Sequence, residues 1–138
     1  MPWENMIKEF GMLADLLLSV LLGFVIGFER KLRFKEAGIR THTIVCVGSA
    51  LMMIISKYAF TAADSARVAA QIVTGVGFLG AGMIVYRRNE VRGLTTAAGV
   101  WATAGVGMAC GGRLYLVALG ATAIIICAQC LFHLPFKL

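Results

Sequence analysis

The sequence predicts an all-α, polytopic membrane protein: a single domain over residues 1–138 that folds as a bundle of five transmembrane helices. Of the 138 residues, 59% are hydrophobic and only 14% are charged, and the mean hydropathy is +0.84. A typical soluble domain is about 45–50% apolar and about 25% charged. Because a chain this apolar has too little polar surface to cover itself in water, its expected surroundings are the lipid bilayer.

Five apolar runs account for most of the chain, and each approaches the length of about 20 residues that one membrane crossing needs. The third and fourth runs are rich in Gly, Ala and Thr, and the fourth is at the short limit for a crossing. The first run contains Asp15 and ends in Glu29-Arg30-Lys31 without a small-residue cleavage site, which predicts a retained helix and not a signal peptide. The expected spans are residues 10–28, 43–60, 68–86, 95–111 and 114–132.

Basic residues are divided unequally between the two sides that these spans define. The segments after the first and third runs, together with the carboxyl-terminal tail, hold nine of the 13 Lys and Arg residues. The positive-inside rule therefore predicts an amino terminus outside the cell and a carboxyl terminus in the cytoplasm. The net charge of +6 lies between apolar runs and not on one soluble face, so no nucleic-acid partner is expected.

Small residues recur every four positions in the first and fourth runs, so each set lies along one side of its helix. In lipid, helices associate largely through such close backbone contacts. One interpretation is packing inside the bundle. The other is an interface with another membrane protein or with a second copy, in a homo-oligomer such as a dimer. The first stripe continues from Asp15 through Ser19, Gly23 and Gly27, and the second contains Gly99, Thr103, Gly107 and Gly111.

The third run carries a glycine-rich segment that follows Gln71. Glycine costs a helix roughly 1 kcal/mol relative to alanine, so four glycines within eight residues need a reason. Tight helix packing is one explanation. A partly unwound segment whose backbone lines an ion or substrate site is the other. The four positions are Gly75, Gly77, Gly80 and Gly82.

Two carboxylates fall within or at the end of the first run. Asp15 lies inside the span, where an ionisable residue marks a functional site or one that reaches interfacial water. Glu29 and its neighbour Arg30 form a charged cluster for which Arg40 and Arg92 are available partners, either as a structural network or as part of an ion site. Mg²⁺ prefers oxygen ligands and is a possible ligand or substrate, but no resident cofactor is predicted. The candidate polar positions are Asp15, Glu29, Arg40, Gln71, Arg92 and Thr95.

Cysteine and histidine give little sign of a metal or catalytic site. Cys127, Cys130 and His133 are three residues apart on one predicted helix, but a zinc site would need a fourth ligand. Small-residue packing is the preferred explanation for the cysteines, and His42 is expected at an interface. Because no nucleophile, base and orienting group can be assembled, the chain is not expected to be an enzyme.

Four stretches together resemble the membrane domain of the MgtC/SapB family, in order over roughly residues 15–130. The resemblance implies a bacterial inner-membrane protein with five transmembrane helices in the same orientation, linked to growth at low magnesium and, in pathogens, to virulence through survival inside macrophages. Many members continue into a soluble cytoplasmic domain that we expect to be absent here. The four stretches are Gly23-Phe-Val-Ile-Gly-Phe-Glu29-Arg30, Ala37-Gly-Ile-Arg40-Thr41, residues 64–82, and Val91-Arg92-Gly-Leu-Thr-Thr-Ala-Ala-Gly-Val-Trp101.

Two functions follow as hypotheses. The resemblance implies action on other membrane proteins, including ATP synthase, so the first hypothesis is a non-enzymatic factor in magnesium homeostasis that works through partner contacts. The two small-residue stripes support it. The alternative is a transporter of Mg²⁺ or another cation, which Asp15 and the glycine-rich run favour. Thr95 departs from the asparagine that some members of the family carry there.

Overall fold

The computed structural model describes residues 1–61 and 64–131, and the five predicted helices are confirmed in it. Three of them, α1, α2 and α3, are long and apolar enough to cross a membrane. The fourth has 18 residues and the fifth, also apolar, has 17, so both lie near the lower limit of length. The elements are α1 (Pro2–Leu32), α2 (Ile39–Tyr58), α3 (Ser65–Met83), β1 (Val85–Arg87), β2 (Glu90–Arg92), α4 (Leu94–Gly111) and α5 (Tyr115–Leu131).

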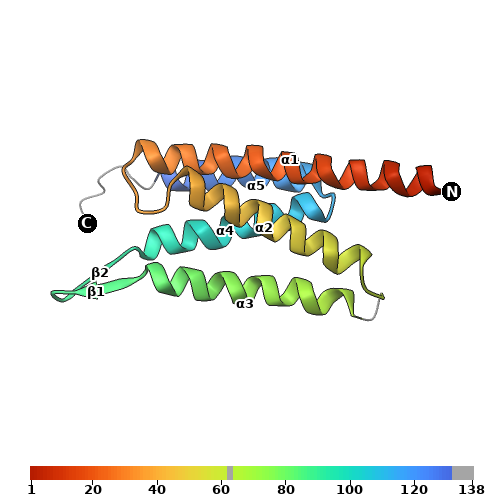
Figure 1. Ribbon diagram of the computed structural model, residues 1–138. Coiled ribbons are helices and arrows are strands. Elements are labelled where there is room, and N and C mark those ends of the chain that lie inside the picture. The colour runs from red at the N-terminus through yellow and green to blue at the C-terminus, as the bar shows by residue number, and fades with distance from the viewer. Residues whose placement is uncertain (62–63, 132–138) are drawn as a thin grey trace.

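Successive helices run in opposite directions, so the connections gather at two ends of the bundle (Figure 1). We call one the hairpin end, because it holds the β1–β2 hairpin, the α1–α2 loop and the end of α5. The other, the far end, holds the α2–α3 and α4–α5 connections. The two loops whose basic residues were counted together therefore lie at the same end. Which end faces the cytoplasm stays a prediction.

The helix α2 lies at the centre of the packing, between α1 and α4, and contacts α3 as well. The stripe of small residues on α1 lets the two backbones meet: a Cβ built at Gly23 would lie 2.9 Å from the carbonyl oxygen of His42. On α4, a Cβ at Gly107 would overlap the carbonyl group of Cys46. Both stripes thus pack inside the bundle. The core around them contains Leu22, Ile26, Cys46, Ala50, Val106 and Cys110.

The third span was predicted to continue to residue 86, and this was wrong. The helix α3 ends at Met83, and the next residues pair as an antiparallel hairpin with Tyr86 opposite Val91. Arg88 and Asn89 connect the strands with φ values of 51° and 66°, as a type I′ turn requires. Gly93 then allows α4 to begin: its φ is +83°, and a Cβ there would overlap the carbonyl oxygen of Met83.

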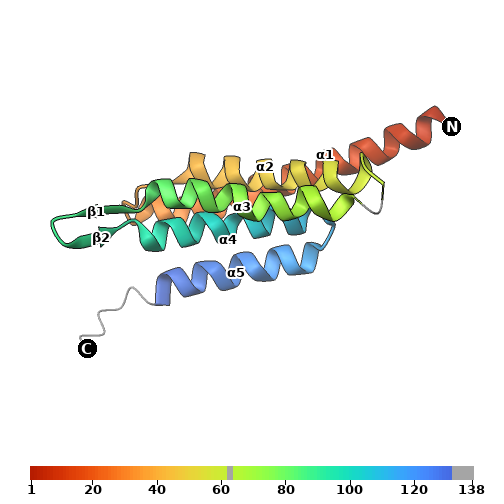
Figure 2. The same ribbon diagram turned by 90° about the horizontal axis from the view of Figure 1, so that it is seen from below.

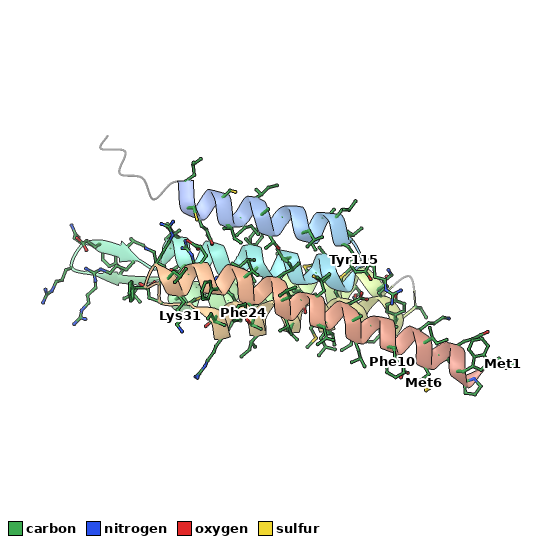
Figure 3. The ribbon with its side chains drawn as sticks, turned by 90° about the horizontal axis from the view of Figure 1, so that it is seen from above. Met1, Met6, Phe10, Phe24, Lys31 and Tyr115 are labelled. Carbon is green, nitrogen blue, oxygen red and sulfur yellow. The ribbon has the colours of Figure 1, made fainter. Side chains whose placement is uncertain are left out.

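The first helix is longer than predicted and begins at Pro2, a residue suited to a first turn. Its amino-terminal part extends past the far end of the bundle (Figure 2). Met6 and Phe10 lie on this extension and are exposed (Figure 3). The other helix ends differ by a few residues at most: α2 begins at Ile39 and ends at Tyr58, and α4 and α5 begin within one residue of prediction. The predicted end of the fifth span, residue 132, lies outside the described residues.

Candidate functional site

The far end holds an ion pair around the carboxylate of Asp15. This side chain is only 2% exposed, and its Oδ2 accepts a hydrogen bond of 3.0 Å from Nε of Arg113. Its Oδ1 accepts one of 2.5 Å from the hydroxyl of Tyr115. Arg113 belongs to the α4–α5 connection, and Tyr115 begins α5 at the end of the bundle where α1 leaves it (Figure 3). The cluster therefore joins α1 to the α4–α5 connection.

This pairing changes the interpretation of Asp15. Arg113 supplies a charge that neutralises the carboxylate, while its own side chain is 37% exposed and reaches the solvent side of the cluster. The hydrogen bond and the negative charge of Asp15 raise the pKa of the Arg113 guanidinium, which stays charged at any physiological pH. In this conformation both oxygens of Asp15 are engaged by the protein. A cation at this carboxylate would therefore compete with the positive charge of Arg113.

The hairpin end holds a second cluster, in which Glu29 lies between two arginines. Oε2 of Glu29 accepts from Nε of Arg30 at 2.7 Å, and Oε1 is paired with Nε of Arg33. Within the described residues, Glu29 is not paired with Arg40 or Arg92, the partners suggested by the sequence. Arg40 is exposed in the first turn of α2, and Arg92 ends β2 of the hairpin. Arg33, one helical turn after Glu29, is the nearer partner by i,i+4 spacing.

The loops at the hairpin end are also joined to each other. The hydroxyl of Thr96, in the first turn of α4, donates a hydrogen bond of 3.0 Å to Oε2 of Glu36 in the α1–α2 loop. A hydrogen bond from the backbone of Glu36 and this one from Thr96 lower the pKa of the Glu36 carboxyl. Arg92 pairs with Glu90 across 3.3 Å on the exposed hairpin. The structure thus brings Glu29, Arg92 and Thr95 to one end of the bundle and leaves Asp15 at the other.

The two stripes of small residues are occupied within the chain. Their hydroxyl groups are satisfied by their own helices: Ser19 donates to the carbonyl of Leu16 at 2.6 Å, and Thr103 donates to that of Gly99 at 2.8 Å. Their glycines contact neighbouring segments: Gly27 lies against Ile39 and Gly111 against α2, so these faces are not available to a partner. Of the two interpretations, the stripes serve packing inside the bundle.

The glycine-rich segment of α3 is neither unwound nor tightly packed. The helix is continuous, and a Cβ built at Gly75, Gly77 or Gly82 would meet nothing within 4 Å. Only Gly80 faces a neighbour, Ala97 of α4 at 3.7 Å. The helix is the least buried of the three long ones, with 17% of its apolar window inside the protein. Gly75 and Gly82, seven residues apart, therefore lie together on one exposed face of α3, whereas Gly77 is exposed on another side of the helix and Gly80 is buried.

Beside this face, a groove of about 440 Å³ lies between α2 and α3. Gly48 of α2 and Gly75 of α3 both line it, and both have open space where a side chain would be. Gln71 also lines the groove and is exposed, so the structure places its amide on the outside of the bundle, between the two helices. An amide in this position can form a hydrogen bond with another helix.

The described cysteines and His42 differ in how deeply they are buried. Cys46 and Cys110 are fully buried in the core, whereas Cys127 is exposed and Sγ of Cys130 lies 3.8 Å from Oε1 of Glu29. His133 lies outside the described residues. His42, expected at an interface, is fully buried: its Nδ1 lies 3.0 Å from the carbonyl oxygen of Gly38, and its Nε2 has no partner within the described residues.

Sequence reasoning missed the residues that pair with the two carboxylates. Arg113 and Tyr115 could have been found from the sequence, because the predicted spans place the connection between the fourth and fifth helices at the same end of the bundle as Asp15. So could Arg33, because it follows Glu29 at i,i+4 spacing. His42 had no such signal: its burial depends on the close approach of Gly23 of α1 and Gly99 of α4, which only the fold determines.

These features define a class: a small, polytopic α-helical membrane protein in which one buried and one half-buried carboxylate are paired with arginines at the two ends of the bundle. The chain belongs to the MgtC family, whose model matches residues 16–134. It is 46% identical over 131 residues to the protein named MgtC of Salmonella typhimurium (strain LT2), a match that covers 94% of this chain and 56% of that protein. No solved structure matches.

Two further relatives extend the comparison. The chain is 42% identical over 142 residues to the Escherichia coli (strain K12) protein named "Putative magnesium transporter YhiD", with 96% of this chain and 65% of that protein covered. It is 44% identical over 133 residues to the protein named MgtC of Brucella abortus (strain 2308), with 96% and 55% covered. The chain thus spans between about half and two thirds of the length of these relatives.

Proposed function

We propose that this chain is a bacterial inner-membrane factor in magnesium homeostasis and adaptation to low Mg²⁺, and that it acts through contacts with a partner membrane protein and not as an enzyme. Membership of the MgtC family supports the link to magnesium, as does the name that the YhiD relative carries. The five-helix fold with three long apolar helices supports the location in a membrane.

One observation favours a partner-binding factor over a cation carrier: among the described residues, the two carboxylates that are not exposed are both engaged by arginines. A permeating cation that sheds water needs oxygen ligands in its place, yet Asp15 is held by Arg113 and Glu29 by Arg30 and Arg33. Between the two clusters, α1 presents the buried side chains of Leu22 and Ile26 to the core. A cation moving from one cluster to the other would therefore cross an apolar layer.

The exposed face of α3 is the surface that we assign to the partner. In lipid, small residues allow a second helix to approach closely, and an amide such as that of Gln71 adds an interhelical hydrogen bond. The groove beside Gly75 offers space for such a helix, because Gly48 and Gly75 both leave it open. The proposed occupant is a transmembrane helix of the partner protein. A second copy of this chain would give a homo-oligomer and is the other outcome of the test.

The test is a substitution that fills the groove without disturbing the fold. We expect Gly75→Leu to keep its thermal stability in detergent and to lose the ability to restore growth at low Mg²⁺ in a strain that lacks the protein. Gly120→Leu is the matched control, since Gly120 of α5 also has nothing within 4 Å of a built Cβ and lies away from the groove. Equal growth with both variants would contradict the assignment of this face. Crosslinking of a cysteine in the groove would separate a second copy from a different protein.

A further inference from the structure

A cavity at the hairpin end lies apart from the groove between α2 and α3. It has a volume of about 390 Å³ and is bounded by α4, α5 and the end of α1. One side is polar, with the side chains of Arg30, Lys35, Thr95 and Gln129. Thr95 is the candidate position identified from the sequence, and the structure gives it these neighbours.

The polar side carries excess positive charge. Arg30 is 2% exposed and donates hydrogen bonds from Nε and Nη2 to Glu29. Glu29 is shared with Arg33, so one carboxylate faces two guanidinium groups, and Lys35 adds a third cation. The exposed carboxylate of Glu36 accepts a hydrogen bond from Thr96 and interacts electrostatically with Lys35, but it lines a separate cavity beside the hairpin. Three cations thus face two carboxylates. The charge therefore favours an anionic ligand.

Two neutral groups add directional contacts. Thr95 lies in the first turn of α4, where backbone N–H groups have no partner within the helix and attract anions such as phosphate. Oε1 of Gln129 is buried and has no hydrogen-bond partner within the described residues. An unsatisfied buried acceptor costs stability, so this oxygen favours a ligand that carries a donor next to its negative charge.

The other side of the cavity is apolar and consists of small side chains. Ala98 and Ala102 of α4 face Ile125 and Ala128 of α5, along the gap between the two helices. This gap continues from the charged end into the membrane-spanning part of the bundle, where lipid acyl chains lie. A ligand that fits both sides has an anionic head and an apolar chain.

We propose that this cavity binds the headgroup of an anionic phospholipid. The phosphate lies against Arg30, Lys35 and the start of α4, and a headgroup hydroxyl donates to Oε1 of Gln129. The first part of an acyl chain follows the alanines between α4 and α5. Basic pockets between transmembrane helices are the usual position for such headgroups. Bound lipid would link the end of α1 to α4 and α5, and would stabilise the hairpin end.

The test measures the thermal unfolding of the whole purified chain in neutral detergent with three additives at matched concentrations. Phosphatidylglycerol carries the phosphate, the hydroxyl donors and the chains. Phosphatidylcholine lacks the net charge and the donors, and inorganic phosphate lacks the chains. We expect a saturable rise in the unfolding temperature with phosphatidylglycerol alone. An equal rise with phosphatidylcholine, or with inorganic phosphate, would overturn the assignment of an anionic lipid.

Two matched pairs of variants locate the effect. Lys35→Gln removes a charge that lines the cavity, and Lys31→Gln removes one at the same end that does not. A basic residue near a lipid headgroup contributes about 1 kcal/mol, or about a fivefold change in affinity. We therefore expect about fivefold weaker phosphatidylglycerol binding in Lys35→Gln only. Ala128→Phe fills the apolar side and should reduce binding, whereas Ala123→Phe, on the exposed side of α5, should not. Equal losses within either pair would overturn the proposal.

Discussion

The buried carboxylate of Asp15 in α1 forms an ion pair with Arg113 of the α4–α5 connection, with Oδ2 and Nε 3.0 Å apart although 98 residues separate the two in the sequence. Tyr115 completes it with a hydrogen bond to Oδ1. An aspartate within a membrane span is expensive unless it is paired. This contact therefore explains how α1 can carry a carboxylate in the bundle, and it fixes the fourth and fifth helices to the first.

The pair predicts coupled effects on stability. Asp15→Asn should lower the stability of the protein in detergent, because it leaves the Arg113 guanidinium facing a neutral amide at the end of the bundle. Arg113→Gln should also lower it, by leaving the buried carboxylate without a counter-charge. The double variant should lose less than the sum of the two single losses, measured by unfolding in increasing denaturing detergent. Strict additivity would show that the two side chains do not interact.

The stripe on α4 gives a prediction with an internal control. A methyl group at Gly107 overlaps the backbone of α2 at Cys46, whereas Gly105 has open space around it. Gly107→Ala should cost about 1–3 kcal/mol or prevent folding, because the helices must separate. Gly105→Ala should be neutral or should stabilise by up to about 1 kcal/mol through helix propensity. Unfolding measurements that rank the two variants the other way round would contradict this packing.

Much of this fold could be predicted from hydropathy, because the five apolar runs are separated by charged segments. The hairpin could not, because Ile84, Val85 and Tyr86 extend the apolar run of α3 without interruption. The helix ends where the hairpin begins, and the hairpin is set by the turn at Arg88 and Asn89 and by Gly93 after its second strand. Apolar content alone does not distinguish a last helical turn from a short exposed strand.

The site was less predictable, because spacing identifies the face of a helix but not its neighbour. The stripe through Gly23 was recognised, yet only the fold shows that α2 occupies it. Gly75 is also a glycine on a helix face, yet no neighbouring helix covers it and it lies open beside the groove. Asp15 was recognised as exceptional, but its role depended on Arg113, and no local pattern joins two residues so far apart in the chain.

The orientation can be tested directly. In a variant whose four natural cysteines are replaced, a cysteine at Asn89 in the hairpin turn should react with a membrane-impermeant thiol reagent only after the cells are opened. A cysteine at Thr61, at the far end of the bundle, should react in intact cells. This follows from the excess of basic residues at the hairpin end. Reversed labelling would place the amino terminus in the cytoplasm and contradict the prediction.

The central claim is that this protein acts on a partner and does not carry a cation, and flux through the purified protein tests it most directly. Protein in liposomes with a Mg²⁺ gradient, followed with an entrapped Mg²⁺ indicator, should show no flux above that of empty liposomes, because Asp15 and Glu29 are held by arginines. The orientation of inserted protein is checked by proteolysis of the hairpin. Saturable flux in the wild type that is lost in Asp15→Asn would contradict the account and identify a transporter.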